Sequence, residues 1–277
     1  GVEAYIAERT RHDKDAGIDN KRYHLTLLAK NNQGYKNLMK LVSLSFLEGY
    51  YYKPRMDEEI LRKYSEGIIC LSGCPAGELA QSLRAKNAEH AEQIVEKYIS
   101  IFGKENFFLE FMNHAEVEGT ETVKQGLIGL SKKYDIPIVA TWDSHYLHKD
   151  DSEAHNTLLA INTNSTSFRF NGDYHFIDPA GAMEYFKDIP EAVENTLKVA
   201  EMVDINLELG TWVFPKFGLE DGHNPESQLK KYVYQGIPKR YGQESAEIIA
   251  RIEYELEIIK NKGFSIYLLI VGDLIRF

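Results

Sequence analysis

The sequence has 277 residues, of which 43% are hydrophobic and 27% charged, and its formal net charge is −10. This composition is ordinary for a globular protein that is long enough for one large domain and part of a second. Because phosphate binding needs clustered cations, the acidic balance argues against strong DNA binding by this chain alone. No apolar run approaches the roughly 18 residues of a membrane span, so we expect a cytoplasmic protein without membrane contacts.

Short apolar runs alternate with amphipathic helical stretches along the first two thirds of the sequence. The predicted strands are residues 23–29, 67–71, 106–111 and 136–141. The predicted helices are residues 35–47, 88–102, 120–134, 152–161 and 190–203. This β-α order favours a barrel-like α/β domain, with an open doubly wound sheet as the alternative. Because four strands cannot close a barrel, we expect further strands to lie outside this sequence.

The character of the sequence changes after about residue 210. Residues 211–225, rich in Gly, Asp, Asn and Pro, predict a linker between a first domain over 1–210 and a second over 226–277. Helices are predicted at 226–241 and 245–262, followed by a last apolar segment up to Phe277. The sequence has no initiator methionine and its last helix has no polar end, so we expect a fragment.

The clearest chemical motif is Thr141-Trp-Asp-Ser-His-Tyr146, which closes a predicted strand. Asp143 and His145 are two residues apart, which places both side chains on the same side of an extended chain. An oxygen donor and a nitrogen donor in this arrangement are typical of metallohydrolases. Taken alone, an Asp that caps the next helix beside a surface His is the more frequent outcome.

Three further donors gain weight only as a group. Singly, His24 would be a core histidine, Cys74 a small buried hydrophobe and Glu3 a solvated acid. Together with Asp143 and His145, each lies in or just after a strand, where α/β sheets gather their site residues. The mixture of sulfur, nitrogen and oxygen donors favours Zn, Mn or Fe over Mg or Ca. Two cysteines are too few for a disulfide framework and indicate a reducing compartment.

Other motifs carry less weight. His114 also follows a strand, and we assign it a supporting role behind the metal ligands or beside a phosphate. The aromatic and basic segment Tyr50-Tyr-Tyr-Lys-Pro-Arg55 could contact nucleic acid or a protein, although a packed loop is favoured. The sequence contains no glycine-rich phosphate loop, no nucleophile elbow and no Cys-x-x-Cys zinc pattern.

The sequence resembles the alpha subunit of bacterial DNA polymerase III in a series of blocks that occur in family order from the first residue to the last. These blocks are Gly1-Val-Glu-Ala-Tyr-Ile-Ala7, Tyr23-His-Leu-Thr-Leu-Leu-Ala-Lys30, Gly34-Tyr-Lys-Asn-Leu38, Leu47-Glu-Gly-Tyr-Tyr-Tyr-Lys-Pro-Arg55, Leu71-Ser-Gly-Cys74, Ala140-Thr-Trp-Asp-Ser-His-Tyr146, Ile189-Pro-Glu-Ala-Val-Glu-Asn-Thr196 and Gly263-Phe-Ser-Ile-Tyr-Leu-Leu-Ile-Val-Gly-Asp273. Two positions depart from the family. Trp142 stands where Asn is common, on the side of the strand opposite Asp143, and Gly272 falls in a usually bulkier stretch.

The resemblance implies a PHP (polymerase and histidinol phosphatase) domain, a distorted α/β barrel with a multinuclear metal site that is here incomplete at its N-terminus. It assigns the later metal ligands of that domain to Glu3, His24, Cys74, Asp143 and His145. The earlier ligands, a His-x-His, an Asp and a further His, would precede the first residue. Residues 226–277 would begin the polymerase palm, and its Mg-binding carboxylates would follow the last residue, so this chain alone is not expected to polymerise.

The resemblance also implies a parent DNA-directed DNA polymerase whose PHP domain binds Zn, Mn or Fe and has a structural or a 3′-5′ exonuclease role. We expect the fragment by itself to hold metal weakly or not at all. The implied partners are DNA, deoxynucleoside triphosphates, and the exonuclease and sliding-clamp subunits of the replicase. The alternatives are a stand-alone PHP phosphoesterase resembling histidinol phosphatase, and a non-catalytic scaffold that docks a proofreading exonuclease.

Overall fold

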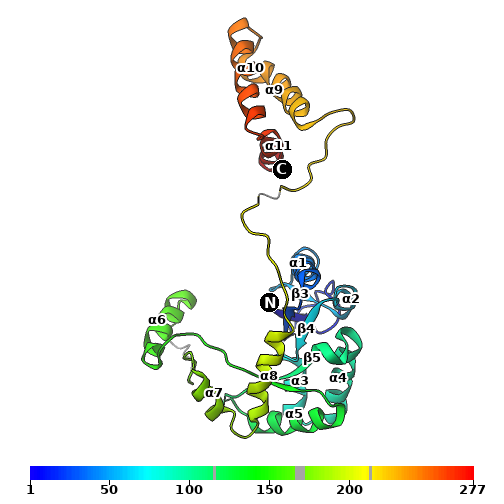
Figure 1. Ribbon diagram of the computed structural model, residues 1–277, viewed down its shortest axis with the longest axis vertical. Coiled ribbons are helices and arrows are strands. Elements are labelled where there is room, and N and C mark those ends of the chain that lie inside the picture. Colours follow the sequence, from blue (N-terminus) through cyan, green and yellow to red (C-terminus); the bar gives the residue numbers. More distant parts are fainter. Residues whose placement is uncertain (115–116, 166–171, 212–213) are drawn as a thin grey trace. The chain divides into compact units, whose positions relative to one another are not determined.

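The computed structural model describes residues 1–114, 117–165, 172–211 and 214–277 (Figure 1). The chain divides into two compact units, Gly1–Leu207 and Glu208–Phe277. The predicted end of the first domain, residue 210, is three residues after the end of the first unit. The predicted start of the second domain, residue 226, is one residue after the first helix of the second unit begins at Pro225. Every described helix is too short or too polar to cross a membrane.

A mixed sheet forms the centre of the first unit, with its described strands in the order β3-β1-β2-β4-β5-β6. The strands are β1 Val2–Ala7, β2 Arg22–Ala29, β3 Arg55–Met56, β4 Ile68–Leu71, β5 Phe107–Met112 and β6 Ile138–Thr141. β2 runs antiparallel to both of its neighbours, β1 and β4, and the other pairs are parallel. The predicted α/β class is confirmed, and the described strands form an open sheet, consistent with a distorted PHP-type barrel.

The antiparallel strands depart from the repeated β-α order that the sequence predicted. Residues 8–21 connect β1 to β2 without a helix, and antiparallel strands, unlike parallel ones, need no crossover helix. β3 was not predicted, and β1 was indicated only by the expectation that Glu3 lies in or just after a strand. β3 is two residues long, too short to produce an alternating pattern.

Eight α-helices belong to the described part of the first unit. They are α1 Asn32–Leu47, α2 Glu58–Lys63, α3 Glu78–Arg84, α4 Ala88–Phe102, α5 Thr120–Tyr134, α6 Ser152–Thr163, α7 Pro179–Tyr185 and α8 Pro190–Glu201, with 3-10 turns at Lys104–Asn106 and Lys149–Asp151. The five predicted helices are confirmed as α1, α4, α5, α6 and α8. The three that were missed span six or seven residues, less than two helical turns, so they carry little periodicity.

The two faces of the sheet have different environments because the side chains alternate. Leu25, Leu27 and Leu109 belong to the face that packs against α1 to α5 in the main core. On the other face, α8 covers one end of the strands through Val199, and Figure 1 shows α8 and α4 on opposite sides of the strands. The remaining part of that second face is open to a cavity.

Polar side chains occupy this uncovered part of the second face. They come from four strands and are Glu3, His24, Thr26, Glu110 and Thr141. In β2 the pattern is regular, with half-buried His24, Thr26 and Leu28 alternating with buried apolar residues. The same alternation that builds the core therefore gathers polar groups at one place.

Arg55 holds the connection between β1 and β2 in place. Its side chain is fully buried, and its guanidinium donates hydrogen bonds to the carbonyl oxygens of Gly49, Asp19, Arg11 and Asp13 at 2.8–3.1 Å. Burial lowers the pKa of Arg55, and the nearby carboxylates of Asp19 and Asp13 oppose this. The buried cation thus satisfies the backbone of a segment that has no regular structure of its own.

The second unit contains three described helices, α9 Pro225–Tyr241, α10 Ala246–Asn261 and α11 Ser265–Arg276, as the sequence predicted. α9 contacts both of the other helices. Leu229 and Ile237 of α9 and Leu269 of α11 are buried. The small number of buried apolar residues means that this unit has little core of its own.

Candidate metal centre

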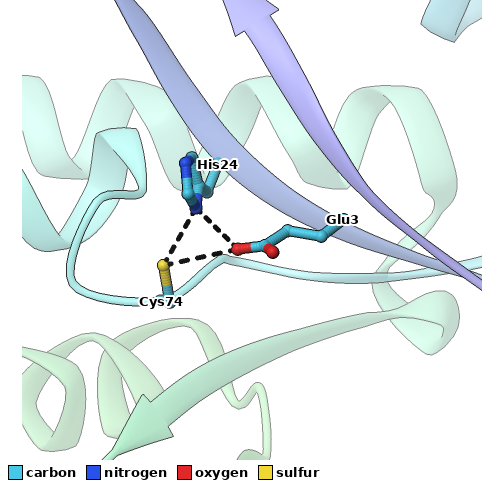
Figure 2. Close-up of side chains that lie close together, drawn as sticks. All are labelled: Glu3, His24 and Cys74. Carbon is cyan, nitrogen blue, oxygen red and sulfur yellow. Dashed lines mark hydrogen bonds and ion pairs between the residues drawn. The ribbon is translucent and has the colours of Figure 1, made fainter. Parts of the chain in front are cut away.

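Glu3, His24 and Cys74 lie close together on the uncovered part of the sheet (Figure 2). The Nδ1 atom of His24 is 2.6 Å from Oε1 of Glu3 and 3.3 Å from Sγ of Cys74. Sγ of Cys74 is 3.8 Å from the same Glu3 oxygen. These three donors, separated by up to 71 residues in sequence, are the group in the described residues that could share one ion.

The strand register places Glu3 and His24 beside each other. β1 and β2 are antiparallel with Tyr5 opposite His24 and Glu3 opposite Thr26, so Glu3 and His24 are diagonal neighbours on one face. The edge of the Tyr5 ring packs against the His24 imidazole at 5.1 Å between ring centroids. His24 therefore lies near the start of β2, inside the strand in which the sequence placed it.

Gly73 allows the segment that carries Cys74 to pass directly beside β2. Its φ is +92°, and a Cβ at this position would lie 2.3 Å from the carbonyl oxygen of His24. The amide of His24 donates to the carbonyl of Ala76, which ties the two segments together. Any side chain at residue 73 would push Cys74 away from His24.

The Cys74 thiol is protonated at neutral pH in the metal-free chain. Burial, together with the neighbouring carboxylates of Glu3, Glu110 and Asp143, raises the pKa of the thiol to about 11, against one backbone hydrogen bond that lowers it. The negative charge around the thiol disfavours a thiolate in the absence of a cation. A divalent cation bound beside it would offset this repulsion and stabilise the thiolate.

Asp143 and His145 line the same cavity as the three clustered donors. They are outside the group whose ligand atoms approach within 4.8 Å of one another. Nδ1 of His145 is 2.9 Å from the carbonyl oxygen of Asp143 and 3.6 Å from its Oδ1. Both residues follow β6, which ends at Thr141, so a loop and not strand alternation directs their side chains.

Aromatic rings form another wall of this cavity. His114 is 3% exposed, and its ring stacks on Trp142 at 5.2 Å and on Tyr174 at 4.6 Å between centroids. Trp142 donates from Nε1 to the carbonyl of His175 at 2.7 Å. The expectation that Trp142 faces away from Asp143 is wrong, because the strand ends before them and both line the cavity.

The segment Asp173–His175 supports the aromatic wall. The backbone amide of His145 donates to the carbonyl of Tyr174 at 2.8 Å. Asp173 accepts hydrogen bonds from Nδ1 of His175 at 2.5 Å, from Lys149 at 3.0 Å and from the Tyr185 hydroxyl at 3.2 Å. Burial alone would raise the pKa of Asp173, but the hydrogen bonds from His175 and Lys149 outweigh it and lower the pKa to about 2.

Replacing Asp173 by asparagine is expected to lower the free energy of unfolding by roughly 1–2 kcal/mol at pH 7. The folded-state pKa lies below the unfolded value of about 4, so this stabilisation is complete above pH 4 and disappears as the pH falls towards 2. Urea titrations of both proteins at several pH values measure the difference. The variant Asp150→Asn, at an exposed acid on the neighbouring 3-10 turn, is the control. A difference that stays constant from pH 7 to pH 2 would contradict this explanation.

One buried acid of the site was not identified from the sequence. Glu110 lies in β5 among apolar residues, is 6% exposed and lines the cavity. A lone acid within Phe107-Phe-Leu-Glu-Phe-Met112 was a usable signal, because an unpaired carboxylate is rarely buried without a purpose.

The two parts of the chain match two protein families. Residues 1–114, which contain the clustered donors Glu3, His24 and Cys74, match the PHP domain family. This part of the chain is thus a PHP domain, as the sequence resemblance implied. Residues 227–277, which include α10, α11 and all but the first two residues of α9, match the family described as bacterial DNA polymerase III alpha NTPase domain.

Proteins named DNA polymerase III subunit alpha are similar to this chain over its whole length. The identity is 36% to the protein of Saccharopolyspora erythraea, 36% to that of Treponema pallidum and 35% to that of Aquifex aeolicus, with 100% of this chain covered in each case. The chain belongs to the family of DNA polymerase III alpha subunits. It spans about a quarter of the length of these relatives, 26%, 24% and 26% respectively.

Proposed function

We propose that this chain is the PHP domain and the adjoining beginning of the polymerase module of a bacterial replicative DNA polymerase. The observation that carries this is the succession of the two family matches in one chain, residues 1–114 and 227–277. A stand-alone phosphoesterase would have no use for the second segment. DNA and deoxynucleoside triphosphates are then the substrates of the full-length protein, and a proofreading exonuclease and a sliding clamp are its partners in the replicase.

We further propose that the PHP domain binds Zn, Mn or Fe through Glu3, His24 and Cys74. Metal bonds of about 2.0–2.3 Å at tetrahedral angles separate neighbouring ligand atoms by about 3.3–3.8 Å. The distances of 3.3 Å from Cys74 to His24 and 3.8 Å from Cys74 to Glu3 fit this range. Nδ1 of His24 and Oε1 of Glu3, which are 2.6 Å apart, form a hydrogen bond that an ion between them would replace. A sulfur, nitrogen and oxygen donor set suits these metals better than Mg or Ca.

Asp143 and His145, which line the same cavity from the loop after β6, would complete the centre. A bound divalent ion would lower the pKa of water and stabilise negative charge on a phosphate group, which suits hydrolysis of a phosphodiester. The chain's own residues would orient the substrate, with the stacked rings of His114, Trp142 and Tyr174 excluding water from one side. This chemistry supports a 3′-5′ exonuclease role in proofreading.

The test uses the full-length polymerase that contains this chain. The purified protein is expected to contain Zn, Mn or Fe by elemental analysis, and to remove a mismatched 3′ nucleotide from a primer. Asp143→Asn should slow this removal by more than about 100-fold, since even partners of metal ligands contribute about 10- to 100-fold, and leave primer extension intact. Asp150→Asn, an exposed acid seven residues later, is the matched control.

Two outcomes would contradict the proposal in different ways. Polymerase free of all three metals would contradict the metal centre. Metal-containing polymerase in which Asp143→Asn lowers thermal stability but leaves proofreading unchanged would favour the scaffold role, in which the PHP domain docks a separate exonuclease.

A further inference from the structure

Glu110 forms an unusual number of contacts for a carboxylate in the middle of a buried strand. Its Oε2 atom accepts hydrogen bonds from the Thr26 hydroxyl at 3.0 Å and from the Gly73 amide at 3.1 Å. Its Oε1 atom accepts one from the Thr141 hydroxyl at 2.9 Å. The backbone amide of Glu110 donates to the Ser72 hydroxyl at 2.9 Å. The carboxylate thereby joins three segments that are distant in the sequence.

Each segment that Glu110 contacts also carries a proposed metal ligand. Thr26 is two residues after His24 and on the same face of β2. Gly73 immediately precedes Cys74, and Thr141 is two residues before Asp143. No other described residue accepts hydrogen bonds from all three of these segments. The side chain therefore lies where it can hold their relative positions.

Both carboxylate oxygens of Glu110 are already engaged with the chain. Its side chain is outside the group of donors that could share one ion, although it lines the same cavity. Burial raises the pKa of Glu110, and the hydrogen bonds from Thr141, Thr26 and Gly73 oppose this rise. Without these three donors, the buried carboxylate would destabilise the fold.

We propose that Glu110 is a positioning residue of the metal centre, which aligns His24, Cys74 and Asp143 through its hydrogen bonds to Thr26, Gly73 and Thr141. This inference rests on the metal centre proposed above and goes beyond it, since Glu110 acts through other residues and does not bind the ion. Hydrogen bonds to groups behind the ligands commonly determine metal affinity by orienting the ligands before the ion arrives.

The test compares Glu110→Ala with Glu110→Gln in the full-length polymerase that contains this chain, using Co²⁺ as a spectroscopic substitute for Zn²⁺. Thiolate-to-cobalt absorption reports ligation by Cys74, and titration of this absorption measures the affinity. Glu110→Ala is expected to weaken Co²⁺ binding about 10- to 100-fold. Glu110→Gln is expected to bind nearly as the unsubstituted chain does. Its amide oxygen can accept from Thr26 and Gly73, and its NH₂ group can donate to the Thr141 hydroxyl.

Two further measurements separate positioning from a general loss of stability. Asn195→Ala removes a buried hydrogen bond of 2.7 Å to the carbonyl of Ile138, at the start of β6 and not at the end that precedes Asp143, and should destabilise the first unit without weakening Co²⁺ binding. Amide hydrogen exchange at Gly73 should accelerate in Glu110→Ala and stay slow in Asn195→Ala. If Glu110→Ala does not fold, Thr26→Val and Thr141→Val each remove one hydrogen bond without shortening the side chain, and each should weaken binding.

The outcomes distinguish the two proposals. No thiolate-to-cobalt absorption in the unsubstituted full-length polymerase at any Co²⁺ concentration would overturn the metal centre and this inference with it. Equal affinity of Glu110→Ala and the unsubstituted polymerase would overturn only the positioning role. Equally weak binding by Glu110→Gln and Glu110→Ala would also overturn it, because the negative charge and not the hydrogen bonding would then be responsible.

Discussion

Replacing Cys74 by alanine is expected to weaken Zn²⁺ binding to the full-length polymerase that contains this chain by more than about 100-fold, since residues that only support metal ligands already contribute about 10- to 100-fold. Cys74 is the single sulfur donor within reach of Glu3 and His24 in the described residues. Its removal takes the one sulfur ligand from the proposed centre and leaves oxygen and nitrogen donors alone, which hold Zn²⁺ less tightly than a set that includes a thiolate. Competition titration with a chromophoric chelator measures the affinity directly.

Cys70 provides a matched control for this prediction, since it is the other cysteine of the chain. Cys70 is fully buried in the main core, on the face of β4 that points away from the cavity. Burial raises the pKa of its thiol well above the ordinary value. Cys70→Ala should therefore lower stability slightly and leave the Zn²⁺ affinity unchanged. Unchanged affinity in Cys74→Ala, or an equal loss in both variants, would place the bound ion elsewhere.

Replacing Arg55 by methionine is expected to lower the free energy of unfolding by about 3–5 kcal/mol, the usual effect of breaking a buried charged network. Methionine fills much of the volume but donates no hydrogen bond. The carbonyls of Gly49, Asp19, Arg11 and Asp13 would then lose a buried donor. Urea unfolding followed by circular dichroism measures the change.

The exposed residue Arg62 is the control for Arg55. Arg62 forms an ion pair with Glu58 on the surface of α2, and such a pair contributes only about 0.5 kcal/mol. Arg55→Lys should lower the free energy of unfolding by less than Arg55→Met and by more than the loss of the Arg62 ion pair. Lysine keeps the charge but lacks the planar fork of donors that reaches several carbonyls at once. Loss of less than about 1 kcal/mol in Arg55→Met would mean that water replaces the guanidinium.

The prediction from sequence was accurate where a segment is long and its pattern strong. The bounds of α4, Ala88–Phe102, and α5, Thr120–Tyr134, match the predicted 88–102 and 120–134, because several turns of apolar spacing define a helix without reference to its neighbours. Short elements such as β3 and α2 were missed. Their few residues form regular structure because they pack between larger elements, and not because of a local pattern.

Local sequence patterns also predicted part of the candidate site. The Asp-x-His pair at 143 and 145 carries a local signal, whereas Glu3 and His24 carry almost none separately. Glu110 was missed because, in a linear reading, an acid within an apolar strand looks like an interruption of the pattern. Its role emerges only when Thr26, Gly73 and Thr141 are seen to converge on it.

The sequence by itself determined the family of this chain, the α/β class of its first unit and the residue types of the donors, since these depend on composition, order and local pattern. The tertiary structure decided which donors meet. Glu3 and His24 are neighbours because β1 and β2 pair antiparallel in one register, and Cys74 reaches them because Gly73 has no side chain to hold the turn away from β2. Such contacts arise from packing between distant segments, and no local pattern of residues encodes them.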